Sequence, residues 1–325
     1  MLAGYLAAMR ALAPAASFTC CVPFALPPLA RRFPEIHWLP YDDPSRATAI
    51  VACDLWLGLG GSPFQCKLSR WFIDHLIGEA ARCARLRKPM YYLGVGVQNT
   101  DELAVPDVQR VCRQAVAIWT RDAASAERLA AAAPGPRIAV AADLAHIFFQ
   151  DTPPPPAAAG RIALVANFDY GAWPGQAACL RAAEAHASHD RVWLAQESRE
   201  LPGAERVLFA SLPAVAHARW RLVSPECPGA PLPEILADWP SAEWLITARY
   251  HAALAGAWAG SRMIVLGTNE KLHAAARDVG AKILSPSADE VTVRRALEDA
   301  PRCAQPAVLA EQARSACAAF VDAAS

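Results

Sequence analysis

The sequence predicts an α/β protein built from two doubly wound, Rossmann-like domains that face each other across a cleft. Short apolar runs typical of strands alternate with helix-forming segments along most of the chain, which is the pattern of parallel sheets covered by helices. Four prolines, Pro153 to Pro156, interrupt this alternation near the middle of the chain, and the alternation then restarts. A proline run of this kind acts as a semi-rigid spacer between domains.

With this spacer as the main boundary, we divide the chain into four parts. We expect an N-terminal domain over residues 1–150, a linker over 151–160, a second domain over 161–300 and a C-terminal helix over 301–325. Residues 2–12 are rich in helix formers, whereas a domain of this class ordinarily begins with a strand. We therefore expect the first domain to lack its first strand.

Glycines follow two of the expected strands in the first domain. The apolar run Thr48–Cys53 predicts a buried strand, with Gly60 and Gly61 in the turn after it. Pro89–Leu93 predicts the next strand, which leads into Gly94 and Gly96. Glycine permits positive φ angles and a close approach of the backbone to a ligand, so these four residues are candidate binding positions.

A further strand of the first domain is expected at Ala115–Trp119, and it leads into Arg121 and Asp122. Asp122 is a suitable N-cap for a helix over Ala123–Ala132. Arg121 then lies at a strand end, where a cation can contact an anionic ligand.

A more specific pattern occurs in the second domain. Trp244–Thr247 predicts a strand that runs directly into Ala-rich helical sequence, and Arg249, Tyr250 and His251 lie at the junction. Ligands of α/β sheets bind at such strand ends, and a helix start attracts anions through its free N–H groups and its dipole. An arginine and a histidine at this place predict an anion-binding and proton-transfer site. The alternative is that Arg249 forms a structural ion pair and His251 only begins the helix.

The next expected strand, Met263–Leu266, is followed by Asn269 and Lys271, so another cation lies at another strand end.

Composition excludes several classes of protein. With 54% hydrophobic and 19% charged residues the chain is typical of a soluble globular protein, and Lys+Arg 31 against Asp+Glu 31 gives no basic surplus for nucleic acid. The ten cysteines show no metal-binding spacing, which favours reduced thiols in the cytoplasm and no metal. Prolines break the uncharged stretch 11–30, so we expect neither a signal peptide nor a transmembrane segment.

Four stretches together resemble the polysaccharide pyruvyl transferase family, in the order in which that family has them. They are the glycine turn at 57–62, the Gly-rich strand end at 88–97, the Arg-Asp-X-X-Ser helix start within 118–129 and the Arg-X-His motif within 247–253. Members of the family usually open with a strand and a Gly-rich Asn-X-Gly-Asp turn, whereas this chain starts at what resembles the helix that follows them. No such motif occurs upstream of Leu55.

The resemblance implies a fold similar to the GT-B glycosyltransferases. It also implies transfer of a pyruvyl group from phosphoenolpyruvate to sugar hydroxyls, as a cyclic ketal, in the biosynthesis of an exopolysaccharide of the cell envelope. Phosphoenolpyruvate is then a donor substrate, no further cofactor is expected, and the acceptor is a saccharide, free or lipid-linked. By position in the motifs, Arg249 and His251 are expected to bind the donor and to supply the acid, and Arg121 to be a second anion-binding residue. Tyr250, Asn269, Lys271 and the four glycines complete the expected binding residues.

Two other functions remain open at the level of the sequence. One is a GT-B-like glycosyltransferase that uses a nucleotide sugar, for which Glu197 and Tyr170 are the candidate ribose-binding and base-stacking residues. The other is a sugar-binding relative without catalytic activity.

Overall fold

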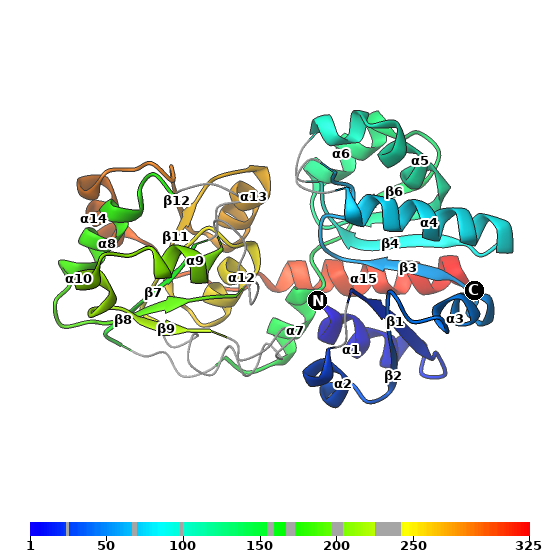
Figure 1. Ribbon diagram of the computed structural model, residues 1–325, viewed down its shortest axis with the longest axis horizontal. Coiled ribbons are helices and arrows are strands. Elements are labelled where there is room, and N and C mark those ends of the chain that lie inside the picture. The colour runs from blue at the N-terminus through cyan, green and yellow to red at the C-terminus, as the bar shows by residue number, and fades with distance from the viewer. Residues whose placement is uncertain are drawn as a thin grey trace. The chain divides into compact units, whose positions relative to one another are not determined.

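The chain forms two compact units, shown in the computed structural model in Figure 1. The structure describes residues 1–23, 26–66, 70–97, 100–154, 159–166, 173–196, 204–224 and 242–325. The first unit comprises Met1–Ala25, Pro34–Asp151 and Ala307–Ser325, and the second comprises Leu26–Phe33 and Thr152–Pro306. The main boundary thus falls beside the proline run.

The first unit contains a four-stranded parallel sheet and a separate parallel pair of strands. The order in the sheet is β3-β4-β5-β6, and β1 pairs with β2. The strands are β1 (Phe18–Val22), β2 (Ile36–Pro40), β3 (Trp56–Leu59), β4 (Met90–Val95), β5 (Ala115–Thr120) and β6 (Arg137–Val140). The helices are α1 (Leu2–Leu12), α3 (Arg46–Ala52), α4 (Trp71–Leu86), the 3-10 helix η1 (Thr100–Ala104), α5 (Pro106–Gln114), α6 (Ala123–Ala132), α7 (Ala145–Asp151) and α15 (Ala307–Ala324).

The strand predicted at Thr48–Cys53 is wrong, because these residues belong to helix α3. A short apolar run fits either a strand or one face of a helix, and here only Ile50 is buried while Val51 is 55% exposed. The strand of this region is β3, which lies in the Gly-rich segment that follows. Gly58 allows β3 to pack closely, since a Cβ at that position would lie 2.4 Å from Cδ1 of Tyr92.

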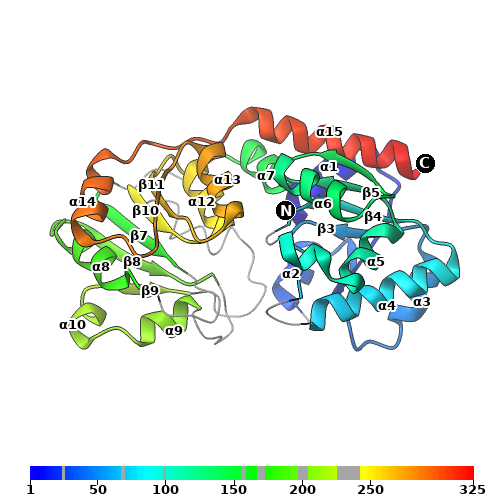
Figure 2. The same cartoon turned by 90° about the horizontal axis from the view of Figure 1, so that it is seen from above.

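Helix α15 returns to the first unit at the end of the chain. It packs against α7, α1 and β4, and Figure 2 shows it along the same side of this unit as α7 and α1. Phe320 makes edge contacts with the rings of Tyr91 and Trp119, and the Tyr91 hydroxyl donates a hydrogen bond to the carbonyl of Ala323. Arg314 forms an ion pair with Asp151. The C-terminal helix is thus an integral layer of the first unit.

The second unit contains a six-stranded parallel sheet with the order β12-β11-β10-β7-β8-β9. Within this sheet β7 is the first strand in the sequence. The chain continues to β8 and β9 on one side of β7 and then crosses to β10 on its other side. The strands are β7 (Arg161–Val165), β8 (Asp190–Leu194), β9 (Arg221–Val223), β10 (Trp244–Thr247), β11 (Arg262–Leu266) and β12 (Lys282–Leu284). The helices are α2 (Pro27–Arg32), α8 (Gln176–Glu184), α9 (Glu205–Ala210), α10 (Ala214–His217), α12 (Tyr250–Trp258), α13 (Glu270–Val279) and α14 (Glu290–Asp299).

This strand order has a known consequence for ligand binding. In an open α/β sheet the ligand crevice lies at the carboxyl ends of the two strands where the order reverses. Here those strands are β7 and β10, and Arg249 follows β10 directly. The central strands carry fully buried side chains such as Leu164, Ile246 and Ile264, as expected for a sheet covered by helices on both faces. The predicted class of two Rossmann-like α/β domains is confirmed.

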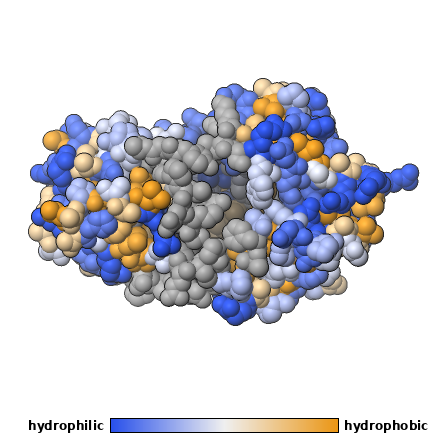
Figure 3. Space-filling view, viewed as in Figure 1, coloured by the Kyte–Doolittle hydropathy of each residue, from blue (hydrophilic) through white to orange (hydrophobic). Residues whose placement is uncertain are grey.

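The surface mixes polar and apolar side chains. In Figure 3 the hydrophobic patches on the visible face are small and separated by hydrophilic ones. Among the described residues, no helix has the length and apolar character required to cross a membrane.

Candidate functional site

Arg249 occupies the junction between β10 and α12. It is the N-cap residue of α12, with an extended backbone (φ −115°, ψ 130°). Its N–H donates to Oγ1 of the fully buried Thr247 at 2.9 Å, and its carbonyl accepts the first helical hydrogen bond, from Ala253. The backbone of Arg249 is therefore held from both sides, so the side chain leaves the sheet edge in a defined direction.

The guanidinium of Arg249 forms a two-pronged ion pair with Glu205, the first residue of α9. Nε lies 2.5 Å from Oε1 and Nη2 lies 3.0 Å from Oε2. The Glu205 side chain is fully buried, whereas that of Arg249 is 28% exposed. Removing one partner of a buried ion pair typically costs roughly 3–5 kcal/mol, so this contact fixes the arginine strongly.

Because α9 follows β8 and α12 follows β10, the Arg249–Glu205 pair spans the carboxyl edge of β7, which lies between those two strands. The backbone of Glu205 is itself anchored. Its carbonyl accepts a hydrogen bond of 2.9 Å from Nε1 of the buried Trp193 on β8.

The other predicted residues of the second unit gather around the starts of α12 and α13, which pack side by side in Figures 1 and 2. Tyr250 is buried, its ring meets that of His251 edge-on at 5.3 Å, and the Nε2 atom of His251 is buried. Nζ of Lys271 lies 5.2 Å from the centre of the Tyr250 ring, a cation–π distance. Asn269 caps α13 by accepting a hydrogen bond from Leu272 N–H. The structure thus brings Arg249, Tyr250, His251 and Lys271 to one edge of the sheet.

The predicted glycines of the first unit lie at the carboxyl ends of β3 and β4. Gly60, Gly61 and Gly94 have positive φ angles of 61°, 72° and 68°, which side chains other than glycine rarely adopt. Gly96 N–H donates to the carbonyl of Gly61 at 2.8 Å, so the two strand ends are joined.

Arg121, at the end of β5, points into this glycine turn. Its Nη1 lies 3.4 Å from the Gly61 carbonyl and its Nη2 lies 3.3 Å from Oγ of Ser62. A Cβ on Gly96 would lie 2.3 Å from Nη2, so any larger residue here would require the guanidinium to move. Only 1% of the Arg121 side chain is exposed, so this geometry ties Arg121 to the turn itself. A direct contact between Arg121 and a substrate stays a prediction.

The two other polar residues of the Arg-Asp-X-X-Ser motif have structural partners. Asp122 accepts a hydrogen bond of 2.7 Å from Ser125 N–H, which confirms that it caps α6. The buried Ser125 hydroxyl accepts a hydrogen bond of 2.9 Å from Val97 N–H, just beyond β4. Through Arg121 and Ser125, the motif after β5 therefore makes contacts with the segments that follow β3 and β4.

Sequence reasoning missed Glu205. Helix α9 is six residues long and was not expected, and no pattern in the sequence relates Glu205 to Arg249 across 44 positions. The sequence offered only a weak indication of a role for Glu205, namely an acidic residue in the first turn of a helix. Glu197 and Tyr170, proposed for a nucleotide-sugar site, lie outside the described residues.

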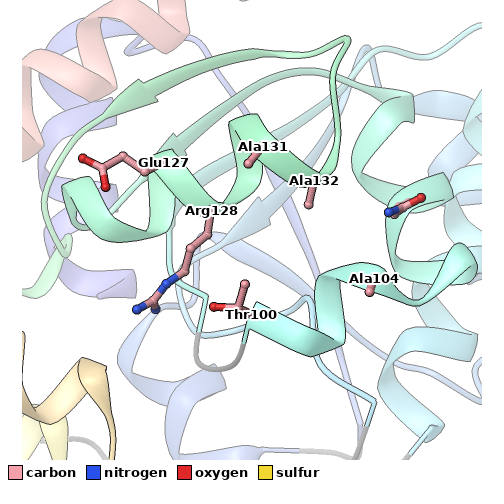
Figure 4. A pocket seen from close by; sticks show the side chains of 7 residues that line it. Thr100, Ala104, Glu127, Arg128, Ala131 and Ala132 are labelled. Carbon is pink, nitrogen blue, oxygen red and sulfur yellow. The ribbon is translucent and has the colours of Figure 1, made fainter.

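A hollow of about 500 Å³ lies beside α6 and η1, and none of the predicted site residues lines it. Figure 4 shows its lining, which combines three alanines with Thr100, Gln109, Glu127 and Arg128. Arg128 is partly engaged, since its Nη1 lies 3.4 Å from the Val97 carbonyl. The hollow is shallow and brings no acid, base or anion-binding group of the predicted chemistry together.

Within the described part of the chain, no group of three or more His, Cys, Asp or Glu residues is arranged to hold a metal ion. Whether the reaction depends on a metal remains a prediction from the sequence.

A family model identifies the chain. The model of the polysaccharide pyruvyl transferase family matches residues 18–270, more than half of the 325 residues. The chain belongs to the polysaccharide pyruvyl transferase family. The match includes the glycine turn, Arg121, Glu205, Arg249 and His251. A search among curated proteins finds no significant match.

Solved structures agree on the fold. UDP-GlcNAc 2-epimerase from Neisseria meningitidis, bound to UDP-GlcNAc, has a TM-score of 0.61 at 11% identity and covers 99% of this chain and 94% of its own. MnaA of S. aureus with UDP has a TM-score of 0.60 at 11% identity, covering 97% and 87%. HepE of Anabaena with UDP has a TM-score of 0.57 at 9% identity, covering 98% and 91%. The fold is therefore GT-B-like, as predicted, and these likenesses carry no further assignment.

Proposed function

We propose that this transferase moves a pyruvyl group from phosphoenolpyruvate to two hydroxyls of a saccharide, forming a cyclic ketal. The observation that carries the proposal is Arg249, held by the backbone and by Glu205 at the switch point of a Rossmann-like sheet, with His251 two residues further on. Family membership supports the transferase class and the saccharide acceptor. The donor is our inference.

The donor carries a carboxylate and a phosphate, and the site offers groups suited to both. Arginine donates paired hydrogen bonds to such anions in a fixed plane. The start of the nine-residue helix α12 adds its positive dipole end, and Lys271 adds a second cation nearby. These charges would also stabilise the negative charge that builds up on the departing phosphate.

In the proposed reaction His251 gives a proton to the methylene carbon of phosphoenolpyruvate while a sugar hydroxyl attacks the neighbouring carbon. A second hydroxyl of the same saccharide then displaces phosphate from that carbon and closes the ketal ring. One hydroxyl proton returns to His251 and restores the acid, and the other leaves with the phosphate. Histidine suits the first step because its ordinary pKa lies close to neutrality.

We propose that the reaction takes place in the cytoplasm, in the biosynthesis of an exopolysaccharide or its precursor. The nine cysteines in the described residues are free thiols, as is usual in a reducing compartment. Burial raises the pKa of the Cys112 and Cys179 thiols to about 12, so these two are unreactive core residues.

A second candidate is a glycosyl transfer or related reaction on a nucleotide sugar. It is favoured by one observation, namely that several proteins of similar fold were solved with UDP or UDP-sugars. A helix start at a switch point can hold a diphosphate as well as it can hold phosphoenolpyruvate.

Isothermal titration of the protein with phosphoenolpyruvate, UDP-glucose, UDP-GlcNAc and a free saccharide tests the proposal. We expect binding of phosphoenolpyruvate and none of the nucleotide sugars. The reverse result would reject the pyruvyl donor. Binding of a free saccharide, with no binding of either donor class, would instead indicate a sugar-binding relative without catalysis.

A further inference from the structure

The ion pair between Glu205 and Arg249 leaves part of the guanidinium available. Arginine has five N–H donors, and Glu205 engages Nε and Nη2, which form one edge of the group. Within the described residues Nη1 forms no hydrogen bond, and the Arg249 side chain is 28% exposed. The edge formed by Nη1 and the second N–H of Nη2 can therefore receive an anion while the ion pair is intact.

Two roles for Glu205 can be distinguished on physical grounds. It could be a placeholder that occupies Arg249 until an anionic ligand displaces it, or a permanent support that aims the guanidinium. Displacement would deprive a fully buried carboxylate of two charge-assisted hydrogen bonds, which is strongly unfavourable. The support role avoids this loss.

Both ends of the pair are also fixed. Trp193 holds the backbone of Glu205, and Thr247 holds the backbone of Arg249. Neither residue can turn away without breaking these contacts, so the position of the guanidinium is defined by the pair. Arginine alone, on a flexible side chain, would lose more conformational entropy when it binds an anion.

We propose that Glu205 is a positioning residue that presents the outer edge of Arg249 to a carboxylate or phosphate group of the donor. This inference rests on the proposed function only for the identity of the donor. The geometry that carries it belongs to the second unit alone.

The test compares phosphoenolpyruvate binding by wild type, Glu205→Gln and Glu205→Asp, with calorimetry so that no acceptor is needed. Gln keeps the shape but not the charge, and Asp keeps the charge but shifts the guanidinium. We expect the dissociation constant to rise in both variants, by roughly 10- to 100-fold for Gln, the equivalent of losing one hydrogen bond to a charged group. The matched control is Glu79→Gln in the first unit. Glu79 is also buried and pairs with Arg46 and Arg82, so we expect its loss to lower the melting temperature without changing the affinity.

Several outcomes would overturn the proposal. Tighter binding by Glu205→Gln would identify Glu205 as a placeholder. An unchanged dissociation constant with a lowered melting temperature would make the pair merely structural. If wild type binds a nucleotide sugar and not phosphoenolpyruvate, the proposed function fails, but the same variants measured with that ligand still decide the role of Glu205.

A ligand-free measurement keeps the proposal testable if binding cannot be measured in a variant. Phenylglyoxal condenses with two guanidinium nitrogens, and peptide mass spectrometry reports its reaction at Arg249. We expect faster modification of Arg249 in Glu205→Gln than in wild type, because loss of the carboxylate charge weakens the contact that engages Nη2. Equal rates would show that Glu205 does not hold the arginine.

Discussion

At the scale of single residues, the planar shape of Arg249 is as important as its charge. We predict that Arg249→Lys raises the dissociation constant for phosphoenolpyruvate by roughly 10- to 100-fold, the equivalent of losing one hydrogen bond to a charged group. Lysine keeps the charge but cannot contact Glu205 and an anion with two separate edges. Arg219→Lys is the control, because Arg219 is 51% exposed in a surface pair with Glu184. Near-normal affinity in Arg249→Lys would mean that Arg249 serves only the fold.

His251 lies at the start of α12 with its Nε2 atom buried. If His251 is the acid, His251→Asn should lower kcat by roughly 10²–10⁴-fold and leave the affinity for phosphoenolpyruvate within a few-fold, because Arg249 and Glu205 remain. Steady-state kinetics with a saccharide acceptor, combined with donor titration, separates the two effects. Unchanged kcat would exclude His251 from proton transfer, and lost affinity with unchanged kcat would make it a donor ligand.

The sequence predicted local roles better than distant partners. Asp122 was identified as a cap because its function depends only on residues up to three positions away, and the structure confirms it. The possibility that Arg249 forms an ion pair was open, but its partner was not foreseen. Glu205 lies 44 positions earlier, and only the sheet order β10-β7-β8 brings it close. The patterns in a single sequence do not reveal the order of strands in a sheet, so they could not identify this partner.

At the scale of elements, α15 is the part of the first unit whose docking can be tested most directly. Phe320 is buried and contacts the rings of Tyr91 and Trp119. We predict that Phe320→Ala lowers the free energy of unfolding of the first unit by roughly 3–5 kcal/mol, since it leaves a cavity between the helix and the sheet.

Urea unfolding followed by circular dichroism measures this loss of stability. Val308→Ala on the same helix is the control, because Val308 is 61% exposed and its truncation should change the stability by less than about 0.5 kcal/mol. If both variants unfold like the wild type, α15 does not contribute to the core of the unit.

The error at Thr48–Cys53 shows where element prediction fails. Seven residues of α3 bury only Ile50, so the segment has too short a pattern to distinguish a helix from a strand. The neighbouring strand β3 contains Gly58 and ends at two glycines, a composition that normally indicates a turn. Packing of Tyr92 against Gly58 favours the strand, and that contact is invisible in the sequence. The longer helix predicted over Ala123–Ala132, whose start is marked by the cap Asp122, was placed correctly.

At the scale of the whole molecule, the alternation of strands and helices was enough to predict two Rossmann-like domains. The order of the strands and the return of α15 to the first unit depend on long-range packing, which one sequence does not encode in a readable way. The predicted site residues belong to both units, with Arg121 and the four glycines in the first and Arg249, Tyr250, His251, Asn269 and Lys271 in the second. Their predicted role in substrate binding therefore has to be tested by a measurement on each unit.

Two compact units in one chain need not unfold together, so ligand effects can be assigned to each. A ligand that binds only the native state stabilises it by ~2.7 kcal/mol at a concentration of a hundred times its dissociation constant. Because Arg249, His251 and Lys271 all lie in the second unit, we predict that phosphoenolpyruvate raises the midpoint of that unit's unfolding transition. Hydrogen exchange read on peptides of α12 and α6 would assign the transitions to the two units.

The same experiment decides the role of Arg121. Its guanidinium is buried against Gly61 and Ser62, so we expect Arg121→Lys to destabilise the first unit by roughly 1–3 kcal/mol, since it removes contacts to a buried turn. If Arg121 serves the turn alone, the shift that phosphoenolpyruvate produces in the second unit should be the same in Arg121→Lys as in the wild type. If Arg121 also contacts the donor, as its place in the family motif implies, that shift should become smaller at equal ligand concentration. A shift that disappears in Arg249→Lys but persists in Arg121→Lys would assign donor binding to the second unit.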